Sequence, residues 1–308
     1  MDQKPSSDLA KSLAGLLTEQ RNPRSTDLDS LSTEETLRLI NSEDKLVPIA
    51  VEREIPYIVS AVELIVHSLR TGGRLIYVGA GTSGRLGVVD ASECPPTFGT
   101  DPNLIIGVMA GGPPAMFRSQ EGAEDNEAQA AKDLDGYQVN SRDTVCGIAA
   151  SRRTPYVVAA VRRARELGAK TIYLTTNPRA DFDLDVDVAI CPEVGPEVLM
   201  GSTRMKSGTA QKLVLNMLTT TTMVKLGKVY ENMMIDLQLT NNKLVERSKR
   251  IIMMATGVDY PTADGFLEKA SGHVKTAIVM IRAGISADQA RERIARADGM
   301  VRRAIELR

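Results

Sequence analysis

The spacing of apolar residues changes along the chain, and its first part indicates helices after an irregular start. Residues 1–31 are polar and rich in turn-forming residues, so we expect an arm or loop there. Ser32 and Glu35 have the spacing of a capping box, in which each side chain satisfies a free amide of the first helical turn. Apolar residues then recur at helical spacing toward the glycines at 72–73, and Pro56 should kink or divide this stretch.

From residue 74 the apolar residues gather in short runs that are typical of buried strands. Five such runs end in small or turn-forming residues: RLIYVGAG, LIIGVMAGG, DTVCGIAAS, KTIYLTTNP and DVAICPEVG. Helical patterns lie between them, for example over 154–167. This alternation predicts an α/β fold, a doubly wound five-stranded parallel sheet flanked by helices.

The remainder of the chain shows helical patterns only. We expect a long helix over 204–226 and, from about residue 241, a small C-terminal helical module. The helices of this module should be interrupted at Gly257, Gly272, Gly284 and Gly299. The expected organisation is therefore an N-terminal arm with helices over 1–60, the α/β domain over 61–240 and the helical module over 241–308.

Composition limits the classes of function. The 308 residues carry 38 basic and 39 acidic side chains, a net charge of -1, which disfavours nucleic acid or a membrane surface as partner and favours a small molecule. No apolar run approaches the roughly 20 residues that span a bilayer. Three scattered cysteines and a start without the apolar core of a signal peptide predict a cytoplasmic protein. Two distant histidines predict no metal site.

The loop after the first run contains G-x-G-x-x-G, formed by Gly79, Gly81 and Gly84. A dinucleotide site would also need a carboxylate at the end of the second strand, and a Walker A loop would need a lysine; neither is present, so we expect no nicotinamide cofactor. The loop instead offers the hydroxyl groups of Thr82 and Ser83 at a helix N-terminus, where a monophosphate binds well.

A second hydroxyl-rich turn follows the third run and also opens a helix. It contains Ser151 and Thr154, and two such turns converging on one anion are a more specific signal than either alone. The alternative is that Ser83 and Ser151 only cap their helices, since serine is strongly preferred at such positions.

The GAGTSGR loop and the SRRTP turn resemble the sugar isomerase (SIS) domain, a fold that binds phosphosugars. Four segments are similar to the N-acetylmuramic acid 6-phosphate etherase family: RLIYVGAGTSGRLGVVDASECPPTFG, EGAEDN, GIAASRRTPYV and GSTRMKSGTAQKLVLNM. The resemblance runs from about residue 16 to the C-terminus. Arg152 departs from it, because the family commonly has glycine there, and a bulky cation would either strengthen or crowd phosphate binding.

The resemblance implies a lyase that releases D-lactate and N-acetylglucosamine 6-phosphate without a cofactor, in cell-wall amino-sugar recycling. Elimination from the open-chain aldehyde needs a base for the C2 hydrogen and an acid for the ether oxygen. The family motifs assign these roles to Glu93 and Glu124, which we expect to face the same end of the sheet. Pro95 and Pro96 should fix a loop just after Glu93.

The resemblance also implies that Glu197 and Ser202 contact the sugar, and that the protein is a homodimer with sites near the subunit interface. A helix cap or a surface charge is the alternative for Glu197 and Ser202.

Two other functions remain open at this point. A sugar-phosphate isomerase would need the base without the acid, and a phosphosugar sensor would carry an attached DNA-binding or partner domain.

Overall fold

The computed structural model describes residues 16–237 and 242–307, and it begins with the irregular segment that the sequence predicts. Two short 3₁₀ turns, η1 (Leu17–Glu19) and η2 (Leu28–Ser30), precede helix α2 (Thr33–Asp44), which has the complete Ser32 capping box. Helix α3 (Val47–Glu52) ends before Pro56, and α4 (Ile55–Arg70) has that proline in its first turn. The proline therefore divides the stretch, as predicted. The part of the arm over 1–15 lies outside the described residues.

All five predicted strands form one parallel sheet with the order β2-β1-β3-β4-β5. Their bounds are β1 (Leu75–Gly79), β2 (Ile105–Met109), β3 (Thr144–Ile148), β4 (Lys170–Leu174) and β5 (Val188–Ile190). In register, Gly79 at the end of β1 lies beside Met109 of β2 and Ile148 of β3. The carboxyl ends of these three strands therefore meet at the same edge of the sheet.

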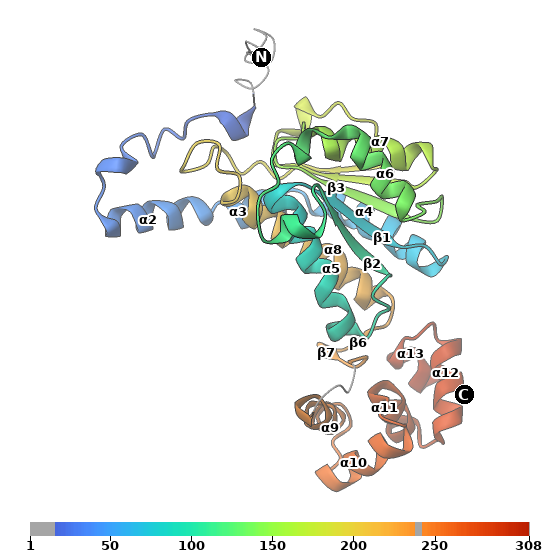
Figure 1. Cartoon of the computed structure of the whole chain (residues 1–308). Coiled ribbons are helices and arrows are strands. Elements are labelled where there is room, and N and C mark those ends of the chain that lie inside the picture. Colours follow the sequence, from blue (N-terminus) through green and yellow to red (C-terminus); the bar gives the residue numbers. More distant parts are fainter. Residues whose placement is uncertain (1–15, 238–241, 308) are drawn as a thin grey trace. The chain divides into compact units, whose positions relative to one another are not determined.

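Helices cover both faces of the sheet, which confirms the doubly wound fold (Figure 1). Helices α6 (Glu127–Gly136) and α7 (Pro155–Glu166) pack on one face over a core that includes Ile76 and Val145. Helix α5 (Gly81–Phe98) packs on the other face, where a Cβ at Gly87 would lie 3.0 Å from Tyr77 Cβ. The long predicted helix is α8 (Lys206–Lys225), and short 3₁₀ turns are η3 (Pro113–Met116), η4 (Ala123–Asp125) and η5 (Arg179–Asp181).

The chain forms two compact units. The first contains the sheet, with residues up to Ser92 and Asn103–Leu218; the second contains Glu93–Pro102 and the residues from Thr219 onward. The second unit has a short hairpin, β6 (Val229–Tyr230) and β7 (Met233–Met234), and the helices α9 (Asn242–Thr256), α10 (Tyr260–Lys269), α11 (Val274–Ala283), α12 (Ala287–Arg296) and α13 (Val301–Glu306).

The helical character of the C-terminal segment and its four glycine interruptions are confirmed. Each of these glycines lies between two helices at positive φ, from 66° to 81°, where a side chain would be strained. The five helices share their own core, which includes Ile252, Ala277 and Ala304. None of the helices in the described ranges is long and apolar enough to cross a membrane.

Candidate active site

The turns after β1 and β3 lie on adjacent strands at the carboxyl edge of the sheet. Strand β1 stands between β2 and β3, so the chain leaves β1 in one direction and later returns to the other side of it. In doubly wound sheets ligands bind in the crevice at this reversal point. Both turns lead into helices, α5 and α7, whose N-terminal amides favour an anion.

The glycine turn after β1 brings strand and helix into unusually close contact. A Cβ at Gly84 would lie 2.7 Å from the carbonyl oxygen of Gly79, and one at Gly79 would lie 2.6 Å from the Gly84 amide nitrogen. These distances leave no room for a side chain. The glycine pattern therefore serves close strand–helix packing, as well as exposing the amides that open α5.

The hydroxyl groups of the glycine turn lie beside the start of α8. Ser83 is 8% exposed, and its Oγ donates to Gln211 Oε1 at 2.9 Å. Thr82 is half-buried, and its Cγ2 would lie 3.5 Å from a Cβ at Gly208. Ser83 is a residue of α5 itself and not its cap, so the capping interpretation is wrong for this residue.

The second turn is held by one carbonyl group. The Ala150 oxygen accepts from Thr175 Oγ1 at 2.9 Å, from Thr176 Oγ1 at 3.3 Å and from Asn177 Nδ2 at 2.7 Å. Ser151 Oγ accepts from the Arg153 amide at 3.4 Å, and so retains its own proton for another acceptor.

The helix-capping interpretation is wrong for Ser151 too. The N-cap of α7 is Thr154, and the Thr154 side chain makes no capping hydrogen bond. Ser151 and Thr154 are both half-buried residues, and neither is fully enclosed by the chain. They are therefore available to a ligand at the N-terminus of α7.

Arg152 lies within this turn at a φ of 59°, in the left-handed region that favours glycine. Its guanidinium pairs with Asp183 at 3.3 Å, and its carbonyl accepts from the Tyr173 hydroxyl at 3.0 Å. The guanidinium is thus paired with a carboxylate of the chain through Nη1 and adds no unpaired charge to the turn. Its buried Nε has no hydrogen-bond partner among the described residues.

We expect Arg152→Gly to change the affinity for a sugar phosphate little. The free energy of unfolding should also change little. Glycine relieves the left-handed backbone by about 1 kcal/mol, and this offsets the lost ion pair with the largely exposed Asp183, which contributes about 0–1 kcal/mol. Calorimetric titration measures the affinity, and urea denaturation measures the free energy of unfolding. A large loss of affinity in this variant would show that the guanidinium contacts the ligand directly.

Glu124 lies on η4 and is exposed. It lines a pocket of about 360 Å³ at the carboxyl ends of β1 and β2, together with Gly81 of the glycine turn. The other lining residues include Ala80, Arg85, Met109 and Ala115. The predicted base and the start of the glycine turn therefore share one pocket of the first unit.

Glu93 lies in helix α5, so the expected loop after it is wrong. The helix continues through Pro95 and Pro96 to Phe98. Ala91, Cys94 and Phe98 are buried at helical spacing, and this packing outweighs the two backbone hydrogen bonds that the prolines remove. The Glu93 side chain is exposed, and Glu93 belongs to the second unit, whereas Glu124 belongs to the first.

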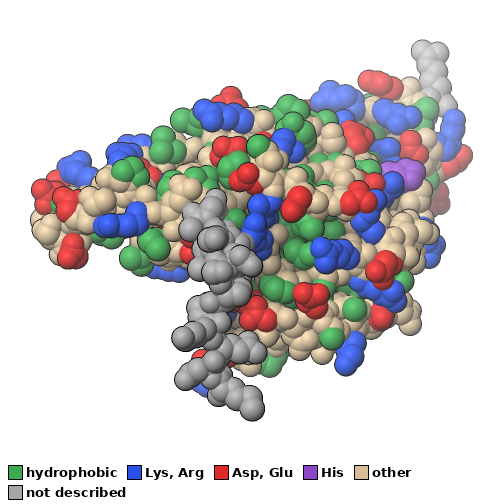
Figure 2. All heavy atoms as spheres, turned by 90° about the horizontal axis from the view of Figure 1, so that it is seen from above, with side chains coloured by type: hydrophobic (Ala, Val, Ile, Leu, Met, Phe, Trp, Pro, Cys, Tyr) green, Lys and Arg blue, Asp and Glu red, His purple; other side chains and the backbone are tan. Residues whose placement is uncertain are grey.

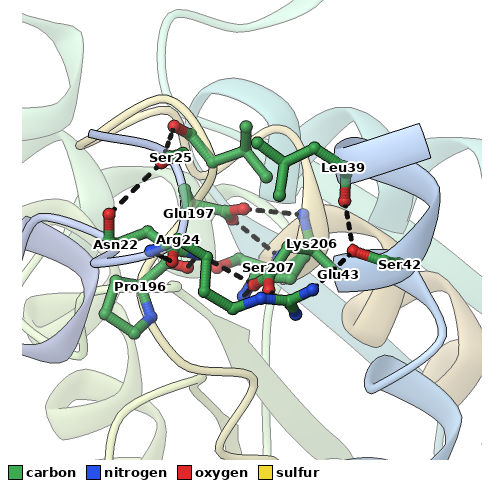
Figure 3. Close-up of polar contacts among 11 residues, drawn as sticks. Asn22, Arg24, Ser25, Leu39, Ser42, Glu43, Pro196, Glu197, Lys206 and Ser207 are labelled. Carbon is green, nitrogen blue, oxygen red and sulfur yellow. Dashed lines mark hydrogen bonds and ion pairs between the residues drawn. The ribbon is translucent and has the colours of Figure 1, made fainter. Parts of the chain in front are cut away.

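Glu197 is completely buried and holds the first turn of α8 (Figure 3). Its two carboxylate oxygens accept from the amides of Lys206 and Ser207, each at 2.9 Å. The structure therefore supports a cap and not a surface charge for Glu197, whose sugar contact remains a prediction. Ser202 is half-buried in the turn that precedes this helix.

A buried ion pair that the sequence did not reveal fixes the N-terminal arm next to this turn (Figure 3). Lys206 Nζ lies 2.6 Å from Glu43 Oε2, and these side chains are 2% and 3% exposed. Asn22 Nδ2 donates to the same carboxylate at 2.8 Å and to the Pro196 carbonyl at 3.1 Å. Burial alone would raise the pKa of Glu43, but the hydrogen bonds from Lys206 and Asn22 lower it below the ordinary value.

The three cysteines are buried and lie outside any disulfide. Burial raises the pKa of the Cys191 thiol to about 11. In the face shown in Figure 2, acidic and basic side chains are interspersed. Within residues 16–237 and 242–307, His, Cys, Asp and Glu side chains form no group of three that could hold a metal ion.

Comparisons with known proteins match nearly the whole chain. Residues 57–165 match the family model for the glucokinase regulatory protein N-terminal SIS domain, and residues 126–221 match that for the SIS domain. The N-acetylmuramic acid 6-phosphate etherase of Salinibacter ruber is 62% identical over 302 residues, 98% of this chain and 97% of that protein. The protein of the same name from Oceanobacillus iheyensis is 53% identical over 94% of this chain and 98% of that protein. A phosphoheptose isomerase structure from Neisseria gonorrhoeae is 20% identical with a TM-score of 0.47, covering 62% of this chain and 98% of that one.

Proposed function

The chain belongs to the N-acetylmuramic acid 6-phosphate etherase family, and from this premise we propose that it cleaves the D-lactyl ether of that sugar phosphate. The products are N-acetylglucosamine 6-phosphate and D-lactate, so the protein is a carbon–oxygen lyase of cell-wall amino-sugar recycling. The observation that carries this function is the 62% identity over 98% of the chain.

The chemistry proceeds through the open-chain aldehyde of the sugar. The carbonyl group acidifies the C2 hydrogen, and the ether oxygen on C3 is β to that carbonyl. Removal of the proton is therefore followed by expulsion of lactate, and water then adds at C3. The reaction needs one group that accepts the C2 proton and one that protonates the departing oxygen.

We assign the base to Glu124 and the acid to Glu93. The position of Glu124 in the pocket beside Gly81 supports its role, because a base must come within hydrogen-bond reach of the proton that it removes. Glu93 is assigned by the family motif alone.

We assign the phosphate to the N-termini of α5 and α7, where hydroxyl groups add donors to amides that already favour an anion. Ser151 retains its hydroxyl proton and the Thr154 side chain makes no capping hydrogen bond, so both hydroxyl groups can donate to a phosphate. In the described part of the chain Gln211 Nε2 has no hydrogen-bond partner. Rotating the Gln211 amide would place this Nε2 against Ser83 Oγ and release the Ser83 proton to the phosphate.

We expect Ser83→Ala to weaken the binding of N-acetylglucosamine 6-phosphate by about 10- to 100-fold. A hydrogen bond to a charged group contributes roughly 1.5–3 kcal/mol, which corresponds to this range. Calorimetric titration measures the affinity. Ser92→Ala is the matched control, because Ser92 is an exposed residue of the same helix. Equal affinities in wild type and Ser83→Ala would remove Ser83 from the site.

We further propose that Thr82, Glu197 and Ser202 complete the sugar pocket, that the enzyme is a cytoplasmic homodimer and that its sites lie near the subunit interface. Close approach of the glycine turn to the start of α8 supports the first part. Three cysteines that form no disulfide support a reducing compartment. Light scattering of the purified protein measures the oligomeric state.

The function itself is tested by incubating purified protein with N-acetylmuramic acid 6-phosphate and measuring free D-lactate. We expect stoichiometric release of lactate and N-acetylglucosamine 6-phosphate. Interconversion of aldose and ketose without lactate would indicate an isomerase. Binding without any turnover would indicate a phosphosugar sensor.

A further inference from the structure

Arg85 is a cation of the pocket that none of the roles above uses. It is a residue of α5, is half-buried and lines the same pocket as Glu124. Two backbone carbonyls hold its guanidinium: Nε donates to Met116 at 3.0 Å and Nη2 donates to Ala115 at 2.8 Å. The group is therefore fixed in place before any ligand arrives.

One edge of this guanidinium has no hydrogen-bond partner among the described residues. Nε and one Nη2 proton form the edge that the two carbonyls occupy, and Nη1 with the second Nη2 proton forms the other. Arg85 makes no further hydrogen bond and no ion pair within the described residues. An end-on guanidinium edge binds a carboxylate through two parallel hydrogen bonds.

The substrate places a carboxylate next to the atoms that react. The base removes the C2 proton, the ether oxygen is on the neighbouring carbon C3, and the lactyl carboxylate is attached a few bonds beyond that oxygen. The phosphate is on C6, at the other end of the sugar. A pocket that holds Glu124 against C2 therefore also lies close to the lactyl carboxylate.

Resting on the proposed function, we propose that Arg85 binds the lactyl carboxylate and selects sugar phosphates that carry it. Among the described residues that line the pocket, Arg85 is the one cation, and the carboxylates of Glu121 and Glu124 would otherwise repel this anion. Arg85 keeps the carboxylate in place while the ether oxygen leaves. It has no corresponding contact with the product sugar.

The test compares two ligands that differ in the lactyl group. In Arg85→Gln we expect the KM for N-acetylmuramic acid 6-phosphate to rise by about 10- to 100-fold. The calorimetric affinity for N-acetylglucosamine 6-phosphate and the rate at which its C2 hydrogen exchanges in D₂O should not change. Arg85→Lys should recover part of the loss, because it keeps the charge but not the planar edge. Arg118→Gln is the matched control, with the same charge change at an exposed position of the segment whose carbonyls hold Arg85.

Each other outcome overturns the proposal in a recognisable way. Weaker binding of N-acetylglucosamine 6-phosphate in Arg85→Gln would assign Arg85 to the phosphate. Slower C2 exchange would show that Arg85 acts only by positioning the loop that carries Glu124. If the wild type releases lactate but Arg85→Gln has an unchanged KM, this inference alone is overturned. No lactate from the wild type would overturn the proposed function together with it.

Discussion

Glu93→Gln is expected to slow lactate release by about 10²- to 10⁴-fold while the C2 hydrogen of N-acetylglucosamine 6-phosphate still exchanges with solvent. Carbanion formation needs only the base and the aldehyde, whereas expulsion of an unprotonated alkoxide is slow. Glu124→Gln should suppress both processes, because it removes the base. NMR in D₂O follows the exchange at C2 without any turnover of the ether.

The control variants address the other carboxylates near Glu124. Glu121→Gln changes a second residue of the pocket lining, and Glu127→Gln changes an exposed residue at the start of α6. Both should retain exchange and lactate release. Loss of exchange in Glu93→Gln with retention in Glu124→Gln would show that the two roles are reversed.

Lys206→Met is expected to lower the free energy of unfolding by about 3–5 kcal/mol at neutral pH, because it leaves the Glu43 carboxylate buried without its main partner. Arg24→Gln removes a second partner of Glu43, but the Arg24 side chain is 52% exposed, so we expect a loss of at most about 1 kcal/mol. Urea denaturation measures both. Equal effects in the two variants would contradict a dominant role for the buried pair.

The same pair gives stability a defined pH dependence. The pKa of Glu43 is lower in the folded protein than the ordinary 4.5, so its contribution is complete above 4.5 and is lost as pH falls through the folded value. Protonated Glu43 is neutral, so it carries no buried charge for Lys206 to compensate. The difference in stability between wild type and Lys206→Met should therefore shrink in acid, and a constant difference would exclude this linkage.

Most of the fold could be predicted because local patterns and packing agree. The five apolar runs are short, β-branched and bounded by glycine or polar residues, and each became a strand of the parallel sheet. The error at Pro95 and Pro96 has a clear reason. Proline disfavours a helix locally, but the burial of Cys94 and Phe98 on the same face sustains α5.

The site could be predicted only where a motif is contiguous. The glycine turn and the Ser151 turn are read directly from sequence, whereas Glu43 and Lys206 are 163 positions apart and each looks like an ordinary exposed charge. The same applies to Arg85, whose proposed role depends on two carbonyls that lie 30 and 31 residues later in the chain. No spacing rule reveals contacts that only the tertiary fold creates.

The long sequence separation of the arm's contacts also affects how the protein is made. Glu43 emerges from the ribosome well before its partner Lys206, and at 5–20 residues per second the interval is about 8–30 s. The Glu54 carboxylate likewise lacks its hydrogen bond from the Cys191 amide until that residue, 137 positions later, has been synthesised. During that interval the nascent chain holds carboxylates without their native partners, so the arm docks only after residue 206 has been synthesised. A ribosome-stalled chain that ends before α8 should leave the arm open to protease.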